Sequence, residues 1–379
     1  MDIADARACF DLPRETAWLN AAYMGPLPRA AVEAGRRAYE RKAAPWGLSI
    51  PDDFFGVPEA LRGEAAKLFA SDADSVALVP SASYGLAAAA ANIRLEAGSE
   101  ILLLDGQFPS NVYVWRTLAE RDGAIVKTVA RSGNETWTEA LAAAIGDRTG
   151  LVACPAVHWI DGGNIDLAAL RPALREAGAA LVLDLTQSLG AQPFDVGAVD
   201  PDFAVAAAYK WLCGPYNSAF LYVAERHHDG TPLEENWIAR EGSSDFARLI
   251  DYRDAYEAGA RRFDMGERSA FQIAPATLES LRLVNAIGPA AIAARCAELT
   301  AAIEAAAAPL GLAADTPDRA AHYLALALPE GAPSDLLERL KAEGVHLSQR
   351  GPRLRIAPHF YNDEADIARF AAALGRALA

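Results

Sequence analysis

Seven short apolar segments alternate with helix-forming segments along the first two thirds of the chain. Segments of this length and composition are typical of strands that are buried on both faces of a sheet. Helical crossovers between parallel strands are right-handed, so the alternation predicts an α/β fold with a mostly parallel, doubly wound sheet. The predicted strands are Val76 to Val79, Ile101 to Leu104, Ala124 to Val129, Gly150 to Pro155, Ala180 to Leu183, Phe203 to Ala207 and Ala219 to Val223.

The same alternation predicts three parts of the chain. Residues 1–56 form an N-terminal segment, with a turn at Gly25 and Pro26 and a helix from about Pro28. Residues 57–262 form the large domain that contains the sheet. Residues 263–379 form a smaller C-terminal α/β domain, which opens with a long alanine-rich helical region from Pro275 to about Ala308.

Composition limits the partners that we expect. The formal net charge of −15 argues against binding to nucleic acid or to anionic membranes. The first ten residues are polar and acidic, unlike a signal peptide, and no apolar run is long enough to cross a bilayer, so we expect a cytoplasmic protein. The four cysteines and six histidines lack the spacing of a metal site or a disulfide framework, so no metal is expected.

Lys210 stands where the strand Phe203 to Ala207 ends, before a turn that contains Gly214 and Asn217. A lysine held against apolar surroundings has a lowered pKa, and the neutral amine can attack a carbonyl to form a Schiff base. The alternative is a lysine that extends from a strand end into water or pairs with a carboxylate. Cys213 is either a reactive thiol near this lysine or, as we expect, a small core residue.

Two further features precede Lys210 in the chain. Asp184 stands at the carboxyl end of a predicted strand, where open α/β sheets place their ligands. The segment from Ser81 to Gly85 opens an alanine-rich helix, and its hydroxyls and N–H groups can bind an anion. A phosphate site, an acid and a lysine, in this order along βα repeats, are the parts needed to hold pyridoxal phosphate.

Five motifs, SASYG, QFPSN, DLTQSLG, YKWLCGP and RLRIAPHFYN, give the chain a family resemblance over nearly its whole length. In order and approximate spacing, the sequence resembles the class V aminotransferase family of pyridoxal-phosphate enzymes, which includes cysteine desulfurases, kynureninases and isopenicillin epimerase-like proteins. The resemblance implies the PLP-dependent transferase fold (aspartate aminotransferase-like, fold type I). It also implies pyridoxal 5'-phosphate as cofactor, an amino acid as substrate, and a homodimer with shared active sites.

The resemblance also implies cofactor contacts. The Ser83 hydroxyl and the N–H groups of Ala82 and Ser83 bind the phosphate, although Ser83 is otherwise an ordinary helix N-cap. Phe108 stacks on the pyridine ring, although a lone phenylalanine after a strand is otherwise a core residue. Asp184 keeps the pyridine nitrogen protonated, so that the ring accepts electrons from Cα. Gln187 contacts the phenolic oxygen of the cofactor and is otherwise a surface residue.

Other positions of the resemblance are less regular. His158 stands where relatives usually place an asparagine near the phenolic oxygen, so it donates a hydrogen bond there, tunes proton transfer, or only packs. Tyr209 binds the phosphate through its hydroxyl, or else packs in the core. Ala207 replaces a hydroxyl residue found in many relatives, so one phosphate contact comes from elsewhere. Ser269 is a candidate, because its loop in the family reaches the phosphate of the partner subunit.

The substrate site is implied in the same way. Arg355 matches the arginine that binds the substrate α-carboxylate, or else it forms a strand-end ion pair. Arg353 alternates with it along the predicted strand and faces the other way. Asn20 and Trp46 are candidates for substrate contacts, because the N-terminal segment lies along the active-site entrance in the family.

Lys210 and Asp184 are therefore the predicted catalytic residues, with Lys210 as the base at Cα. These parts are shared by transaminases, β-elimination lyases and racemases. The loop before Arg355 contains no cysteine, which argues against a persulfide-type cysteine desulfurase. We predict an aminotransferase, with a β-elimination lyase or an epimerase as the alternative. A catalytically silent cofactor-binding protein is disfavoured, because the lysine, the acid and the arginine are all present.

Overall fold

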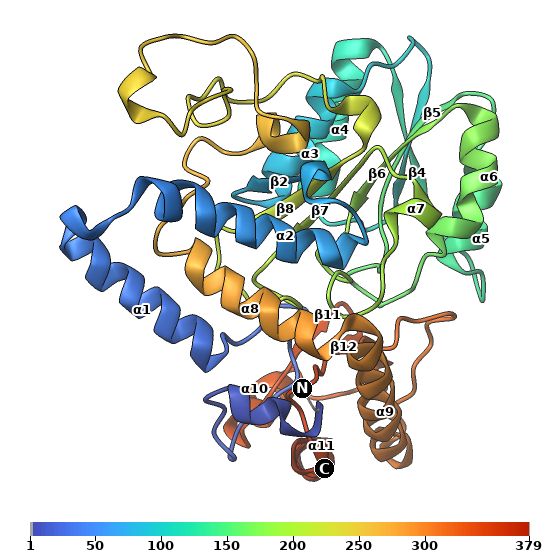
Figure 1. The fold of residues 1–379 in the computed structure, drawn as a ribbon. Coiled ribbons are helices and arrows are strands. Elements are labelled where there is room, and N and C mark those ends of the chain that lie inside the picture. Colours follow the sequence, from blue (N-terminus) through green and yellow to red (C-terminus); the bar gives the residue numbers. More distant parts are fainter. Residues whose placement is uncertain (1–2, 379) are drawn as a thin grey trace.

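The structure, a computed structural model, describes residues 3–378 and is organised around a seven-stranded sheet (Figure 1). The strand order is β2-β8-β7-β6-β5-β3-β4, and all neighbours pair in parallel except β8, which is antiparallel to both β2 and β7. The seven strands are β2 (Val76–Val79), β3 (Glu100–Leu104), β4 (Ile125–Val129), β5 (Thr149–Pro155), β6 (Ala180–Asp184), β7 (Phe203–Ala207) and β8 (Ala219–Val223). The predicted strands and the mostly parallel sheet are confirmed, and each strand end lies within one residue of its prediction.

Helices cover both faces of this sheet. Successive strand residues point to opposite faces, so Val205 packs in one core and its neighbours Ala204 and Ala206 pack in the other. The face of Val205 is covered by α3 (Ala82–Asn92) and α4 (Ser110–Asp122). The opposite face is covered by α2 (Val57–Phe69), α5 (Trp137–Ala144), α6 (Leu167–Ala177), α7 (Val196–Val199), α8 (Ala274–Ile287) and the start of α9 (Pro289–Ala307).

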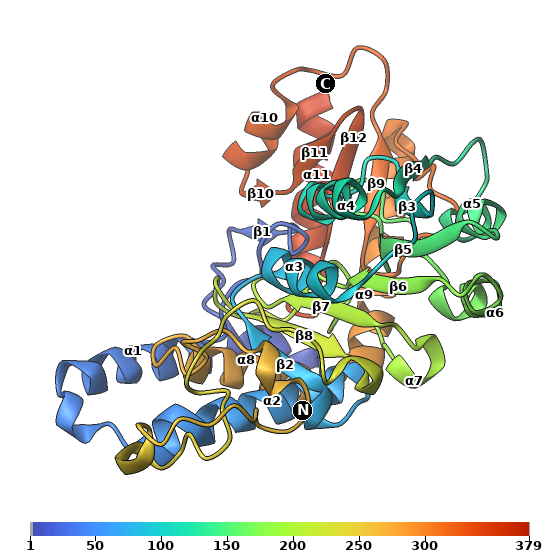
Figure 2. The same ribbon diagram turned by 90° about the horizontal axis from the view of Figure 1, so that it is seen from above.

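The C-terminal part of the chain forms a second, smaller sheet. Its strands β11 (Ser348–Arg350), β12 (Arg353–Ile356) and β9 (Leu324–Ala327) pair antiparallel in that order, and α10 (Leu336–Ala342) and α11 (Glu364–Leu378) pack nearby. The N-terminal strand β1 (Ala17–Trp18) joins this part by pairing in parallel with β10 (Val345–His346), and the two lie side by side in Figure 2. The two ends of the chain therefore pack together, while the boundaries 1–56, 57–262 and 263–379 stay a prediction.

Of the helices that flank the large domain, α1 on the N-terminal side begins where the sequence predicts, whereas the helical region on the C-terminal side differs from its prediction. Helix α1 (Arg29–Ala43) begins directly after Pro28, as predicted, and packs against α8. The single helical region expected from Pro275 to about Ala308 is instead two helices, because Gly288 adopts a φ of 88° and ends α8. Within residues 3–378, no single helix has the length and apolar composition to cross a membrane; α8 and α9 reach both only together, across a bend of 76°.

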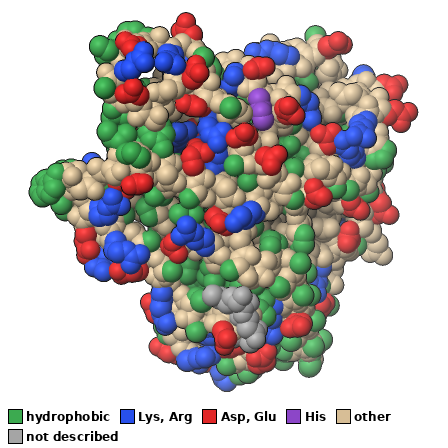
Figure 3. Space-filling model, viewed as in Figure 1, with side chains coloured by type: hydrophobic (Ala, Val, Ile, Leu, Met, Phe, Trp, Pro, Cys, Tyr) green, Lys and Arg blue, Asp and Glu red, His purple; other side chains and the backbone are tan. Residues whose placement is uncertain are grey.

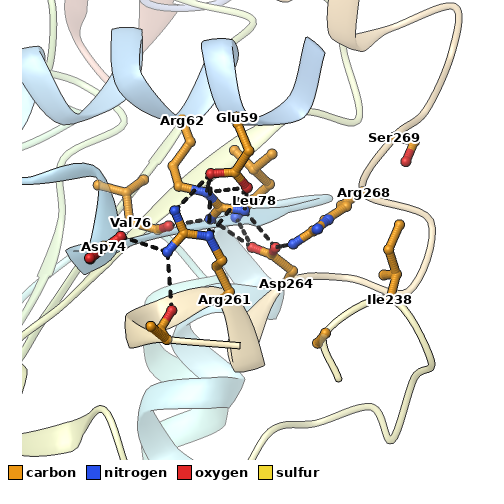
Figure 4. Close-up of polar contacts among 12 residues, drawn as sticks. Glu59, Arg62, Asp74, Val76, Leu78, Ile238, Arg261, Asp264, Arg268 and Ser269 are labelled. Atoms are coloured by element: carbon orange, nitrogen blue, oxygen red, sulfur yellow. Dashed lines mark hydrogen bonds and ion pairs between the residues drawn. The ribbon is translucent and has the colours of Figure 1, made fainter. Parts of the chain in front are cut away.

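A buried network of charges ties α2 and β2 to the chain that follows the large sheet. The Asp264 carboxylate accepts hydrogen bonds from Arg62 (2.7 and 3.0 Å) and from Arg268 (2.6 Å), as Figure 4 shows, and from the backbone N–H of Leu78 (2.7 Å). Burial alone would raise the pKa of Asp264, but the charges of Arg62 and Arg268 lower it. The network thus holds residues 264–268 against the start of the sheet.

We expect Asp264→Asn to lower the free energy of unfolding by about 3–5 kcal/mol, because it removes the fully buried carboxylate that Arg62 and Arg268 share. Urea denaturation followed by circular dichroism measures this loss. The matched control is Asp251→Asn, which removes an exposed ion pair with Arg248 and is expected to cost less than about 1 kcal/mol. Equal effects of the two substitutions would show that the buried network does not stabilise the fold.

Candidate functional site

Lys210 lies directly beyond the carboxyl end of β7, where it is only 8% exposed. Its backbone is covered by the N-terminal segment, since the Gly25 N–H donates to the Tyr209 carbonyl at 2.8 Å. A Cβ atom on residue 25 would lie 2.1 Å from the Lys210 carbonyl oxygen, so only glycine fits there. Gly25 was predicted as a turn residue, and its close approach to the lysine was missed.

A cavity of about 250 Å³ opens between Lys210, the end of β6 and the start of α3. Most of the predicted cofactor residues line it, namely Ala82, Ser83, Phe108, Asp184, Gln187, Tyr209 and Lys210. They come from four different βα or ββ connections of the large sheet, which meet here because parallel strands end at the same edge. The structure therefore brings together the side chains that the sequence placed more than a hundred residues apart.

The Lys210 amine lies in low-polarity surroundings. Its Nζ lies 5.6 Å from the ring centroids of both Phe108 and Tyr209. Burial lowers the pKa of Lys210 to about 8, partly opposed by the Asp184 carboxylate and reinforced by the positive charges of Arg355 and Arg350. A substantial fraction of this amine is therefore neutral near pH 8, as nucleophilic attack on a carbonyl requires.

One end of the cavity is built to receive an anion. Helix α3 begins at Ala82, and its first N–H groups have no acceptor within the helix. The N-cap is Ser81 and not Ser83, because the Ser81 hydroxyl accepts from the Tyr84 N–H at 3.2 Å. Ser83 lies in the first turn with its hydroxyl 2.9 Å from that of Ser81. The N-cap alternative for Ser83 is thus wrong, and Ser83 lines the cavity.

The same cavity contains hydrogen-bonding groups that the sequence did not single out. The side-chain amide nitrogen of Asn111 is buried and has no partner among the described residues, although its side-chain oxygen accepts from the Trp115 indole N–H at 2.7 Å. Thr186 and Ser218 also line the cavity. The Thr186 hydroxyl accepts from the backbone N–H of Ala207 at 3.2 Å, so a hydroxyl lies beside the position where Ala207 lacks one.

Another part of the cavity wall carries the carboxylate. Asp184 ends β6, and its side chain accepts from the Thr186 N–H at 3.0 Å, which fixes its direction. Gln187 is held by two contacts: its amide nitrogen donates to the Ala22 carbonyl at 3.0 Å, and its amide oxygen accepts from Trp211 at 2.9 Å. One N–H of the Gln187 amide is left for a ligand.

His158, predicted to contact the cofactor, is not among the residues that line the cavity. Its Nδ1 lies 2.9 Å from the Asp161 carboxylate and its Nε2 lies 3.1 Å from the Asp105 carbonyl, so both ring nitrogens already face protein oxygens. Burial would raise the pKa of Asp161, but the hydrogen bond from His158 and further contacts lower it to about 2. His158 therefore packs beside the cavity, and its role toward the cofactor stays a prediction; the next residue, Trp159, lines the cavity.

A second cavity, of about 550 Å³, shares Phe108, Trp159, Tyr209, Lys210 and Tyr216 with the first and extends to Arg355. Arg355 is 1% exposed, and its Nε donates to the Ser348 hydroxyl at 2.8 Å while a terminal nitrogen donates to the Trp159 carbonyl at 3.3 Å. Lys210 thus lies on the wall between a cavity with an anion site and a cavity with a buried arginine.

The strand-end ion pair considered for Arg355 is formed by Arg353 instead. Arg353 pairs with Asp315 at 2.6 and 3.0 Å and lines neither cavity. The expectation that it faces away from Arg355 is wrong, because residues two apart on a strand project from the same face, and only its place farther along the strand keeps Arg353 out of the cavity. Asn20 reaches Arg355 only indirectly, because its side-chain oxygen accepts from the Ser348 hydroxyl at 3.3 Å. Asn20 therefore helps to position Arg355, and no direct substrate contact of Asn20 is apparent from the lining of the cavity.

Two further predicted residues lie outside both cavities of this single chain. The Ser269 hydroxyl donates to the Phe54 carbonyl at 3.0 Å, and Figure 4 shows Ser269 apart from the charge network on the same loop. Its contact with the phosphate of a partner subunit stays a prediction. Trp46 is 86% exposed beyond the end of α1 and does not reach the site within one chain.

The chemistry of the first cavity fits pyridoxal phosphate. It combines a helix N-terminus for the phosphate, a carboxylate for the pyridine nitrogen, and an amine for the carbonyl. The side-chain amide nitrogen of Asn111, which has no acceptor among the described residues, is a further hydrogen-bond donor at this cavity. No cluster of three or more potential metal ligands of the His, Cys, Asp or Glu type occurs in the described part of the chain.

Comparison with known proteins gives the same assignment over most of the chain. The model of the aminotransferase class-V family matches residues 28–371. The chain is 31% identical to isopenicillin N epimerase from Streptomyces clavuligerus over 400 aligned positions, which cover 98% of each chain. It is 29% identical to the uncharacterized aminotransferase YcbU from Bacillus subtilis, over 82% of this chain and 80% of YcbU.

A solved structure shows the fold. A mutant of C-DES with glycine covalently linked to its PLP cofactor superposes with a TM-score of 0.85 at 19% sequence identity, covering 99% of both chains. That likeness confirms the predicted fold, fold type I of the PLP-dependent enzymes.

The lowered pKa of Lys210 predicts how the cofactor-free protein reacts with added pyridoxal phosphate. We expect the rate of covalent attachment to rise with pH to about 8 and then level off, because only the neutral amine attacks the aldehyde. An ordinary lysine, with a pKa of about 10.4, would give a rate that still rises above pH 9. Stopped-flow absorbance measures the rate, and borohydride reduction with peptide mapping locates the bond.

The neighbouring charges supply the control for this measurement. Arg355→Gln should move the midpoint to higher pH, because the charge of Arg355 lowers the pKa of Lys210. Arg353→Gln should leave it unchanged, because Arg353 is paired with Asp315 outside the site. A wild-type midpoint near pH 10 would show that burial does not perturb this amine.

Proposed function

The chain belongs to the class V aminotransferase family, whose cofactor is pyridoxal 5'-phosphate, and on that premise we propose that it is an aminotransferase acting at Cα of an amino acid. The observation that carries the proposal is the position of Lys210 on the wall shared by the two cavities. From there one amine reaches both the cofactor and the substrate.

The residues of the first cavity divide the work of holding the cofactor. The N–H groups of Ala82 and Ser83 and the hydroxyl groups of Ser83 and Tyr209 would bind the phosphate, since all three residues line the cavity at or near the start of α3 or beside Lys210. Bound pyridoxal phosphate supplies a carbonyl for covalent attachment and a ring that accepts electrons. The Asp184 carboxylate would hold a proton on the ring nitrogen; it stands at the end of β6, and the backbone N–H of Thr186, two residues later, fixes its direction.

Lys210 and Arg355 act on the substrate. The Arg355 guanidinium, held by Ser348 and by the Trp159 carbonyl, binds the α-carboxylate and so orients the bonds at Cα. Lys210 Nζ then removes the proton from Cα as a general base. Its pKa of about 8 lies close to a physiological pH, which is where a base is most effective.

The cysteines support a reaction without a persulfide. Cys154, Cys213 and Cys296 are fully buried, and burial raises the pKa of each of these thiols. Cys9 lies in the N-terminal segment Ile3–Cys9 and packs against the core. A desulfurase of the persulfide type needs an accessible thiolate at the substrate, and all four thiols lie elsewhere.

Epimerisation is the second candidate, because the isopenicillin N epimerase matches this chain along its full length. Inversion at Cα by two residues requires a proton donor or acceptor on the face opposite Lys210. Tyr209 is one titratable neighbour, and burial raises its pKa to about 12, which makes it a poor base near neutral pH. Transamination needs only the one base that the structure provides.

The test is the absorbance spectrum of the holoprotein during addition of single amino acids without an oxo acid. We expect one turnover per site, conversion of the cofactor to its pyridoxamine form, and one equivalent of oxo acid. The opposite enantiomer with an unchanged spectrum at the end would indicate the epimerase, and continuous release of ammonia and an oxo acid would indicate a lyase. Either outcome contradicts transamination.

Lys210→Ala is the control for the same test. This variant should bind pyridoxal phosphate without a borohydride-stable bond and should lose its reaction with amino acids. If no amino acid alters the wild-type spectrum, the protein is a silent cofactor-binding protein.

We also propose that the protein is a homodimer with shared sites. Exposed apolar residues gather beyond α1 and along residues 231–258, and hydrophobic side chains line the corresponding left edge of Figure 3. They include Trp46, Trp237, Ile250 and Tyr252. Contiguous exposed apolar patches commonly mark protein–protein interfaces.

Sedimentation velocity at micromolar concentration should give twice the mass of one chain. The Ser269 prediction requires this assembly, because Ser269 does not reach the phosphate site of its own chain. A monomer that is fully active would exclude shared sites.

A further inference from the structure

We propose that Arg350 binds a second anionic group of the substrate, so that the preferred substrates are amino acids with an acidic side chain. The inference rests on the proposed function, because it concerns the second cavity of the same site, the one that extends to Arg355 and that we call the substrate cavity. It names a residue that neither the motifs nor the family resemblance singled out.

The substrate cavity is strongly positive. Its described lining contains three basic side chains, Lys210, Arg350 and Arg355, and neither an aspartate nor a glutamate. The nearest carboxylate of the site, Asp184, lies in the other cavity. This charge contrasts with the whole chain, whose net charge is −15, so the positive cavity is a local feature and not a consequence of composition.

Arg350 has no carboxylate partner among the described residues. One terminal nitrogen donates to the neighbouring Gln349 carbonyl at 2.7 Å, and the guanidinium lies over the Trp159 ring, 5.4 Å from its centroid. Burial, and after it the charge of Arg355, lowers the pKa of Arg350. A partly buried guanidinium without a counter-ion is costly, and an incoming anion would remove that cost.

Arg353 shows that the absence of a partner is specific to the cavity. It lies on the same β11–β12 hairpin and stands opposite Arg350 in the register, yet it is bonded to both oxygens of Asp315. The hairpin therefore carries one arginine neutralised by an acid and two, Arg350 and Arg355, that are directed to the substrate cavity.

Trp159 places the two unpaired guanidinium groups relative to each other. Its carbonyl accepts from Arg355 at 3.3 Å, and its ring lies beneath Arg350. Its own indole nitrogen donates to the Gly106 carbonyl at 2.7 Å, which fixes the ring against the large sheet. Two cationic groups are thus held on one tryptophan, on an antiparallel hairpin that cannot readily change their spacing.

The depth of the two arginines assigns their ligands. Arg355 is fully buried behind Ser348, next to Lys210, and suits the α-carboxylate that must lie close to the reacting Cα. Arg350 is less buried, and the same cavity is lined by the exposed rings of Tyr23 and Tyr216. These exposed rings mark the open side of the cavity. With the α-carboxylate held at Arg355, the side chain of the substrate extends toward that open side, so Arg350 meets a side-chain anion.

The experiment is isothermal titration calorimetry of the holoprotein with acids that lack an amino group. We expect succinate or glutarate to bind at least about tenfold more tightly than butyrate or pentanoate of the same chain length, because the second carboxylate makes a charge-assisted hydrogen bond. Arg350→Gln should reduce that ratio to less than about threefold. Arg353→Gln is the matched control and should keep the wild-type ratio.

The remaining arms separate this inference from the proposed function. Arg355→Gln should weaken the diacids and the monoacids alike, because both use the α-carboxylate site. The rate of the spectral change gives kcat/KM for each amino acid. The wild type should prefer glutamate to glutamine and aspartate to asparagine, and Arg350→Gln should lose this preference.

Two outcomes would overturn the proposal while leaving the aminotransferase assignment intact. One is equal binding of diacids and monoacids to the wild type. The other is an Arg350→Gln variant that keeps the full preference for acidic ligands, which would place the second anion on another residue. If instead no amino acid perturbs the cofactor but the diacid preference is present and depends on Arg350, the proposed reaction fails and the anion site stands.

Discussion

The burial of one amine, that of Lys210, is the constraint on which the rest of this structure depends. Its desolvation lowers the pKa to about 8 and makes the amine reactive, but a buried cation also needs nearby groups that tolerate it. Asp184 supplies a compensating charge from the next strand. Gly25 closes the N-terminal segment over the lysine backbone at a distance that no side chain would allow.

The large sheet provides the precision that this arrangement needs. Parallel strands end at a common edge, so Asp184, Lys210 and the start of α3 meet without long flexible connections. The Asp264 network fixes residues 264–268 to α2 and β2, at the edge of the sheet that β2 forms. The smaller C-terminal sheet then brings Arg355 and Arg350 to the same amine from the opposite end of the chain.

The two cavities differ in charge, and this difference organises the chemistry. The first combines an acid with an anion-binding helix terminus, which suits a cofactor with a pyridine nitrogen and a phosphate. The second has only basic groups among its charged lining residues, which suits substrates that bring their own negative charge. Lys210 faces both, so the covalent and the proton-transfer roles fall to one residue.

Much of this protein was determined by the sequence alone. The seven strands followed from short apolar runs, and Lys210, Asp184 and Arg355 followed from their places at strand ends and in motifs, because these signals are local. Other features were decided only by the tertiary structure. They are the break at Gly288, the capping by Ser81, the ring contacts of His158, and the places of Gly25, Trp159 and Arg350. Each depends on contacts between segments far apart in the chain, such as Gly25 with Lys210 or Trp159 with Arg350, and no local pattern encodes which of two neighbouring side chains a distant segment will meet.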